Sequence, residues 1–146
     1  MPGTLKERLR ADVNEARRAR DKLRTLVLTT TLAELRNREI ELGREATDAD
    51  VIEVVQRAVR KRGEAAEQFR AGGRLELSEK EQQEAVLLGA YLPPALDEAQ
   101  VRGFIREAIA AGASSIGAVM GAIMPKIKGS FDGRDANRIA REELGT

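Results

Sequence analysis

Apolar residues recur every three or four positions along almost the whole chain, a spacing that places their side chains on one face of an α-helix. After Thr4, for example, Leu5, Leu9 and Val13 follow at this interval. No stretch alternates apolar and polar residues over a length that suits a β-strand. The pattern therefore predicts an all-α protein.

Residues that cap helix N-termini divide this pattern into separate helices. The spacing of a capping box, in which two residues three positions apart bond each other's backbone, occurs at Thr4/Glu7, Thr47/Asp50 and Ser78/Glu81. Further helix starts are expected at Asp21, Asp97, Ser114 or Ser115, and Asp132. Stop signals stand at Gly43, at Gly72-Gly73 and at Gly112.

The Pro93-Pro94 step is the clearest candidate for a domain boundary, because neither proline can donate a backbone hydrogen bond. About four helices are expected before it and three shorter ones after it. We therefore predict an N-terminal helical bundle over residues 1–93 and a small C-terminal three-helix domain over residues 94–146. A unit of roughly fifty residues is near the lower limit for a core of its own.

The composition supports a packed core and narrows the possible chemistry. Of the 146 residues, 42% are hydrophobic and 34% are charged, with only three Phe and one Tyr. The chain contains no His and no Cys, which excludes His-based catalytic triads, disulfides and the common zinc sites. No acidic cluster has metal-site spacing, and the phosphate-loop patterns are absent. We expect no catalytic residues, no metal and no cofactor.

Membrane and export signals are also missing from the sequence. No apolar run approaches the roughly 18 residues of a membrane helix. The opening segment, MPGTLKERLRAD, lacks the apolar core of a signal peptide. We expect a soluble, cytoplasmic protein without a membrane partner.

The tail carries a local excess of positive charge. Its basic residues, the candidate nucleic-acid contacts, are Lys126, Lys128, Arg134, Arg138 and Arg141. Only Asp132 and Asp135 oppose these five, so residues 126–141 carry a net charge of +3, whereas the whole chain carries +1. Pro125 is expected to end a helix and to present the two lysines. Such a patch suits phosphates, although cations at a helix C-terminus are favoured by the helix dipole alone.

A second basic edge is predicted near the N-terminus. Arg10, Arg17 and Arg24 recur every seven residues and would share one side if the first two helices were continuous. Such an edge can bind phosphates. The alternative is a solvated face that is balanced by neighbouring acidic residues, and the charge spacing does not decide between the two.

Gly117 and Gly121 lie four residues apart and give one side of a predicted helix a smooth surface. This surface would admit either close helix packing or the close approach of a partner's backbone.

Several motifs of the chain resemble the GatB/YqeY family. In the tail they are Met120-Gly121, Met124-Pro125-Lys126, Lys128-Gly129, Asp132-Gly133 and Asn137. Similarity to the family also extends to the opening LKERLRADVNEARRARDKLRTLVL, to residues 57–69 and to YLPPAL before the tail, so the resemblance covers nearly the whole chain. It implies a small helical protein with two lobes. The tail is similar to the end of the B subunit of the glutamine-dependent Asp-tRNA/Glu-tRNA amidotransferase.

The resemblance implies a role in tRNA-dependent amide formation. The expected partner is tRNA, bound by an accessory protein related to the amidotransferase system, a glutamine-dependent carbon–nitrogen ligase. Catalysis by this chain is not expected, because 146 residues leave no room for the separate catalytic domain of the B subunit. The alternative is a protein–protein adaptor that docks on an aminoacyl-tRNA synthetase or an amidotransferase. The oligomeric state is left open.

Overall fold

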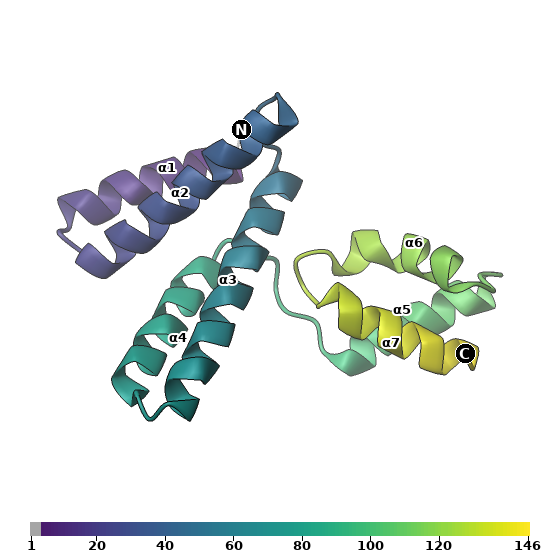
Figure 1. The fold of residues 1–146 in the computed structure, drawn as a ribbon. Helices are drawn as coiled ribbons and strands as arrows, with labels where there is room; N and C mark the ends of the chain where they lie inside the picture. Colours follow the sequence, from purple (N-terminus) through teal and green to yellow (C-terminus); the bar gives the residue numbers. More distant parts are fainter. Residues whose placement is uncertain (1–3) are drawn as a thin grey trace. The chain divides into compact units, whose positions relative to one another are not determined.

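The computed structural model describes residues 4–146, a range that contains seven α-helices (Figure 1). Their bounds are α1 (Leu5–Arg18), α2 (Lys22–Leu42), α3 (Asp48–Ala71), α4 (Leu75–Gly89), α5 (Glu98–Ala110), α6 (Ile116–Ile127) and α7 (Gly133–Leu144). Backbone packing divides the chain into two compact units, the first ending at Leu92 and the second beginning at Pro93. The predicted all-α fold, with an N-terminal bundle of four helices and a C-terminal group of three, is confirmed. Within residues 4–146, no helix is long and apolar enough to cross a membrane.

The N-terminal unit consists of two helical hairpins. α1 and α2 run antiparallel because only residues 19–21 separate them, and residues 72–74 join α3 to α4 in the same way (Figure 1). α2 packs against α1, α3 and α4, which places it at the centre of the bundle. The largest fully buried side chains of this unit are Leu9, Leu28, Leu35, Leu88, Val27, Val51 and Val55.

Polar contacts connect the helices at the edge of this core. The Tyr91 hydroxyl, which follows α4, donates a hydrogen bond to Asp12 on α1, and the Arg8 guanidinium lies 4.6 Å from the centroid of the Tyr91 ring. Burial and the Asp12 carboxylate both raise the pKa of Tyr91. Between α3 and α4, Arg62 Nε lies 3.2 Å from Glu84 Oε2, and both side chains are largely buried. The Tyr91 contacts therefore join the second hairpin to the first, and the Arg62–Glu84 contact joins the two helices of the second hairpin.

The C-terminal unit has a separate core. α5, α6 and α7 each pack against the other two, and their shared cluster contains Val101, Ile105, Val119, Ile123, Ile127, Ala136, Ile139 and Ala140. Phe131, in the turn between α6 and α7, packs against this cluster. The backbone N–H of Leu96 donates a 2.8 Å hydrogen bond to the carbonyl of Ser130, so the segment before α5 is held to the same turn.

Side-chain caps set the start of most helices. The predicted caps are confirmed at Thr4, Asp21, Thr47, Asp97, Ser115 and Asp132. The stop signal at Gly43 is confirmed as well, since this residue follows α2 with a φ of 69°, a left-handed conformation that suits glycine.

The predicted capping box at Ser78 and Glu81 is wrong. α4 already begins at Leu75, and its N-cap residue, Arg74, makes no side-chain capping bond. Ser78 lies buried inside the helix, where its Oγ donates a 2.8 Å hydrogen bond to the carbonyl of Ala66 on α3. A serine that bonds a neighbouring helix has the same local sequence spacing as one that caps its own helix.

The prediction that Pro125 ends a helix is also wrong. α6 continues through Pro125 to Ile127, and the N–H of Lys128 donates a 2.9 Å bond to the carbonyl of Met124. Proline removes its own N–H from the helical ladder and crowds the carbonyl four residues earlier, here that of Gly121, yet the bond from Lys128 continues the helix past it. Lys126 therefore belongs to the last turn of α6, and Lys128 is the residue that ends it.

Candidate nucleic-acid interface

The start of α7 places three of the predicted contact residues on one outward face. Asp132 Oδ1 accepts hydrogen bonds from the backbone N–H of Arg134 at 2.7 Å and of Asp135 at 3.3 Å, and this cap begins the helix at Gly133. Helical spacing then aligns Arg134, Arg138 and Arg141, which are all exposed. The opposite face of α7 is buried and carries Ala136, Ile139 and Ala140.

The end of α6 positions the two lysines. Lys126 is half-exposed, with its Nζ 5.3 Å from the centroid of the Phe104 ring and 3.9 Å from Glu107 Oε2 on α5. Glu107 is itself largely exposed, and an exposed ion pair of this length neutralises little charge. Lys128 follows the helix with an extended backbone, and Gly129 turns the chain with a φ of 83°.

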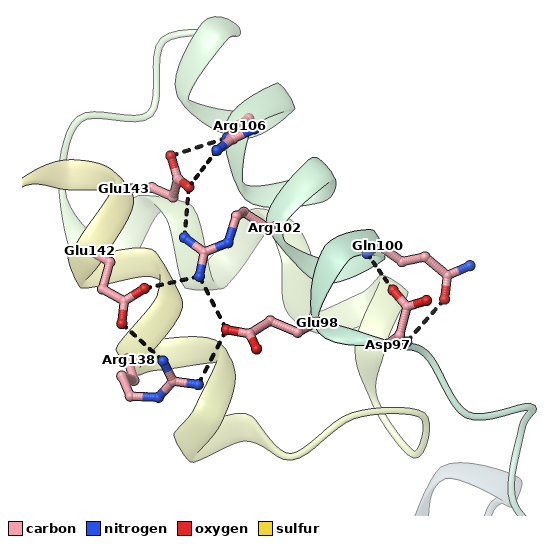
Figure 2. A network of polar contacts seen from close by, with 8 residues as sticks. All are labelled: Asp97, Glu98, Gln100, Arg102, Arg106, Arg138, Glu142 and Glu143. Carbon is pink, nitrogen blue, oxygen red and sulfur yellow. Dashed lines mark hydrogen bonds and ion pairs between the residues drawn. The ribbon is translucent and has the colours of Figure 1, made fainter.

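An ion-pair network joins α5 to α7 (Figure 2). The guanidinium of Arg102 is at its centre, 2.8 Å from Glu143 and 2.9 Å from Glu142. Glu98, one turn earlier on α5, lies 3.1 Å from the same guanidinium. The hydrogen bonds from Arg102 and Arg138 lower the pKa of Glu142, and together the three glutamates raise the pKa of Arg102. The network therefore fixes α7 against α5.

Arg138, one of the predicted contact residues, belongs to this network (Figure 2). Its guanidinium lies 2.9 Å from Glu142 Oε1 and 3.4 Å from Glu98 Oε1. Hydrogen bonding to Glu142 raises the pKa of Arg138. Although half of the side chain is exposed, two carboxylates already compensate its charge, so Arg138 has a structural role that the sequence did not indicate.

Arg134 and Arg141 retain more of their charge. Arg141 Nε donates a 2.9 Å hydrogen bond to Asn137 Oδ1, a neutral acceptor. Among residues 4–146, the Arg134 side chain has no ion-pair partner. Among the predicted contact residues whose pairings the structure describes, Lys126, Arg134 and Arg141 have the least compensated charges. We call these three residues the tail cations.

The predicted N-terminal edge is not one continuous surface. α1 ends at Arg18, so the chain reverses before Arg24. Arg24 instead lies 3.8 Å from both Asp12 Oδ1 and Glu15 Oε1. Arg10 and Arg17 do share a groove, but their third basic neighbour is Arg36 of α2. The position of Arg36 could have been predicted, because a short turn makes α1 and α2 an antiparallel hairpin. Such a hairpin places the end of α2 beside the beginning of α1.

Groups with strongly shifted pKa values serve the fold. The pKa of Asp50 falls because its carboxylate bonds the Arg44 guanidinium and the backbone N–H of Thr47. These atoms form the start of α3. Arg44 also lines a groove with Glu39, whose pKa is lowered by hydrogen bonds from Lys6 and from the backbone N–H of Ala46. Within the described range, no cluster of three or more His, Cys, Asp or Glu side chains is placed to hold a metal ion.

Comparison with known proteins identifies the family. The sequence pattern of the family described as "Yqey-like protein" matches residues 6–144. A relative from Pyrenophora tritici-repentis, "Altered inheritance of mitochondria protein 41, mitochondrial", is 28% identical over 144 residues, which cover 94% of this chain and 80% of the relative. An uncharacterized protein from Schizosaccharomyces pombe is 45% identical over 47 residues, 32% of this chain and 38% of that protein. The chain therefore belongs to the YqeY-like protein family.

Proposed function

We propose that this protein is a tRNA-binding accessory factor of tRNA-dependent amide formation and that it contacts tRNA through its C-terminal unit. The observation that carries the proposal is the set of exposed tail cations, positioned by the end of α6 and the outward face of α7. Membership of the YqeY-like family supports it, given the resemblance of the tail to the end of the amidotransferase B subunit.

The charge of the tail cations suits a phosphate backbone. Guanidinium groups donate paired hydrogen bonds to phosphate oxygens, and lysine adds a mobile positive charge. The net charge of the whole chain is only +1, so attraction must come from a local surface rather than from the overall field.

The proposal assigns no catalytic step to this chain. Its carboxylates with lowered pKa values are hydrogen-bonded to arginines or, in the case of Glu39, to Lys6. The sequence contains no His or Cys for general acid–base or nucleophilic chemistry. A protein that binds tRNA for another enzyme needs neither a general acid or base nor a nucleophile. The proposal keeps the cytoplasmic location that the sequence led us to expect.

A salt-dependent titration tests tRNA binding. Fluorescence anisotropy would follow labelled total tRNA as the protein is added at several salt concentrations. Binding to phosphates should weaken linearly on a logarithmic salt scale, and each phosphate contact that is removed should lower the slope by about 1. The triple variant K126A/R134A/R141A should therefore show a slope smaller by about 3 and an affinity at least about tenfold lower.

A matched control separates the tail from general charge. The variant R18A/R70A/R74A also removes three exposed arginines, all of them in the N-terminal unit. It should keep most of the wild-type affinity. No binding by the folded wild-type protein at low salt, or equal affinities for the two triple variants, would disprove a tRNA contact at the tail cations.

A protein adaptor is the second candidate, and the outer face of α6 favours it. Gly117, Ala118, Gly121 and Ala122 are all exposed there. A Cβ atom added at Gly117 or at Gly121 would meet no atom within 4 Å, so this face is smooth and open. The variant Gly121→Gln should fold normally yet block a close helix contact. Capture from a ribonuclease-treated extract of an aminoacyl-tRNA synthetase or amidotransferase subunit by wild type, and its loss in G121Q, would favour the adaptor.

A further inference from the structure

A groove between α1 and α2 collects arginines without carboxylates. It has a volume of about 370 Å³ and is lined by Arg10, Val13, Asn14, Arg17, Thr29, Leu32, Ala33 and Arg36. These residues form two stripes, one on each helix, and each stripe has the spacing i, i+3, i+4 and i+7. Because the helices run antiparallel, Arg10 and Arg36 lie toward one end of the groove and Arg17 lies beside Thr29 at the other.

The arginines of this groove form no ion pair of their own among the described residues, although Arg36 also borders a second groove that contains Glu39 and Glu45. Among residues 4–146, neither Arg17 nor Arg36 has an ion-pair partner, and both are exposed. The charge of Arg10 acts on Glu39, whose pKa it helps to lower. That carboxylate is already bound by Lys6 Nζ at 2.6 Å and by the backbone N–H of Ala46 at 2.8 Å. The groove therefore presents Arg17 and Arg36 without an ion pair among the described residues, and Arg10 with only a through-space attraction to the Lys6-bound Glu39.

A neighbouring groove between α2 and α3 provides a contrast. It also contains cations, namely Arg38, Arg57 and Lys61, but its lining includes Glu34 and Glu41. Arg38 lies 2.9 Å from Glu41. Cations that are paired with carboxylates in the same groove are typical of an ordinary solvated surface. The α1/α2 groove lacks any such carboxylate among its eight lining residues.

The floor and polar groups of the α1/α2 groove define what it can hold. Val13 and Leu32 are buried beneath it and give an apolar base. Asn14 adds an amide at the rim, and Thr29, which also lines the groove, has a buried hydroxyl oxygen with no hydrogen-bond partner in the described structure. A volume of this size is at the lower end of the range for small-molecule sites. An apolar floor with arginines at its rim suits a base or sugar that carries a phosphate.

We propose that the α1/α2 groove binds a phosphate-bearing ligand of about one nucleotide, with Arg10 and Arg36 contacting it at one end of the groove and Arg17 at the other. The ligand is either a free nucleotide or one nucleotide unit of an RNA strand. The shared chemistry is a phosphate attached to a group that covers the apolar floor. This site lies in the N-terminal unit and uses none of the tail cations. The proposal therefore does not depend on tRNA binding by the tail.

Two probes distinguish the two sources of the phosphate. Heteronuclear NMR of the full 16.0 kDa chain would follow the backbone amides of Asn14 and Thr29 during titration with AMP and, separately, with a short single-stranded RNA. Shifts with AMP indicate a free nucleotide, whereas shifts with RNA alone indicate a strand, and either result supports the groove. The absence of groove shifts with both probes would overturn it.

Variants then test the arginines. R17A/R36A should bind the active probe about tenfold or more weakly, since each hydrogen bond to a charged group contributes about that factor. R17K/R36K, which keeps the charge but loses the bidentate guanidinium, should show a smaller loss. The control R18A/R70A removes the same charge outside the groove and should bind like wild type. If R17A/R36A binds as tightly as this control, the arginines do not hold the phosphate.

These outcomes are independent of the tRNA titration. A tail variant that keeps its tRNA affinity leaves the groove prediction unchanged, because the groove is tested with AMP and with substitutions that lie in the N-terminal unit alone. Both exchanged arginines are exposed and form no ion pair with any residue that the structure describes. Their loss should therefore leave the fold intact, and amide spectra of the variants verify this directly.

Discussion

At the scale of single residues, the local sequence was enough to predict some hydrogen-bond partners and not others. Asp132 and Thr47 could be assigned as caps because a cap bonds only to N–H groups two or three positions ahead, which the sequence itself specifies. Ser78 could not be assigned, since its acceptor is a carbonyl on another helix. Arg138 was expected to be available to a ligand, but its carboxylate partners include Glu98, forty positions away. Partners on another helix, such as Glu98 for Arg138, are not specified by local spacing, whereas the i, i+4 contact of Arg138 with Glu142 is.

Thr29 permits a direct prediction at this scale. Its hydroxyl oxygen is buried without a hydrogen-bond partner among the described residues, and an unsatisfied buried polar atom is unfavourable. Thr29→Val replaces the hydroxyl by a methyl of similar shape and should stabilise the free protein by about 1 kcal/mol. Urea unfolding followed by tyrosine fluorescence measures this, because the chain contains one Tyr, no Trp, and a buried Tyr91 in the same unit.

Thr31 is the matched comparison. Its hydroxyl is buried as well, but it donates a 2.8 Å hydrogen bond to the carbonyl of Val27. Thr31→Val should therefore destabilise the protein by about 1 kcal/mol. The two substitutions remove the same atom from the same helix, so equal effects would show that hydrogen bonding does not determine their sign.

At the scale of elements, helix existence was predictable and helix pairing was not. The recurrence of apolar residues specifies one buried face for each helix, and the caps specify where most helices begin. Neither the apolar spacing nor the caps indicate which helix faces pack against each other. Arg10, Arg17 and Arg36 share a groove only because the turn at residues 19–21 makes α1 and α2 antiparallel. The expected edge with Arg24 failed for the same reason, since that expectation treated two helices as one.

The start of α3 predicts a dependence of stability on pH. Asp50 Oδ2 lies 2.6 Å from the Arg44 guanidinium and accepts a 2.8 Å hydrogen bond from the Thr47 N–H. The pKa of this carboxyl in the folded protein is far below its ordinary value of 3.8. Because the folded pKa is lowered, the stabilisation is complete above the unfolded value and is lost as pH falls below it.

Asp50→Asn should therefore cost about 2 kcal/mol at pH 7. The difference from wild type should shrink as the pH is lowered below about 4. Urea unfolding of both proteins between pH 7 and pH 2, again followed through Tyr91, measures the difference. A cost that stays constant over this range would mean that the carboxylate charge contributes nothing to the start of α3.

On the scale of the whole molecule, the sequence predicted two groups of helices but left their energetic relation open. The structure gives each group its own buried cluster, one containing Leu88 and Tyr91 and the other containing Ile105 and Ile139. The C-terminal group adds the network centred on Arg102. A core of eight residues contributed by three short helices is small, and such a unit has little stability to lose.

Ile105→Ala tests whether the two units unfold separately. Ile105 is fully buried, so its truncation should cost about 3 kcal/mol, enough to unfold much of the C-terminal unit before any denaturant is added. Helical circular dichroism should then fall in the absence of urea, while the urea midpoint reported by Tyr91 stays at its wild-type value. Leu88→Ala, an equally buried change in the other unit, should shift the Tyr91 midpoint strongly. A Tyr91 midpoint that moves in I105A would show that the units unfold as one, because substitutions at energetically independent sites leave each other's transitions unchanged.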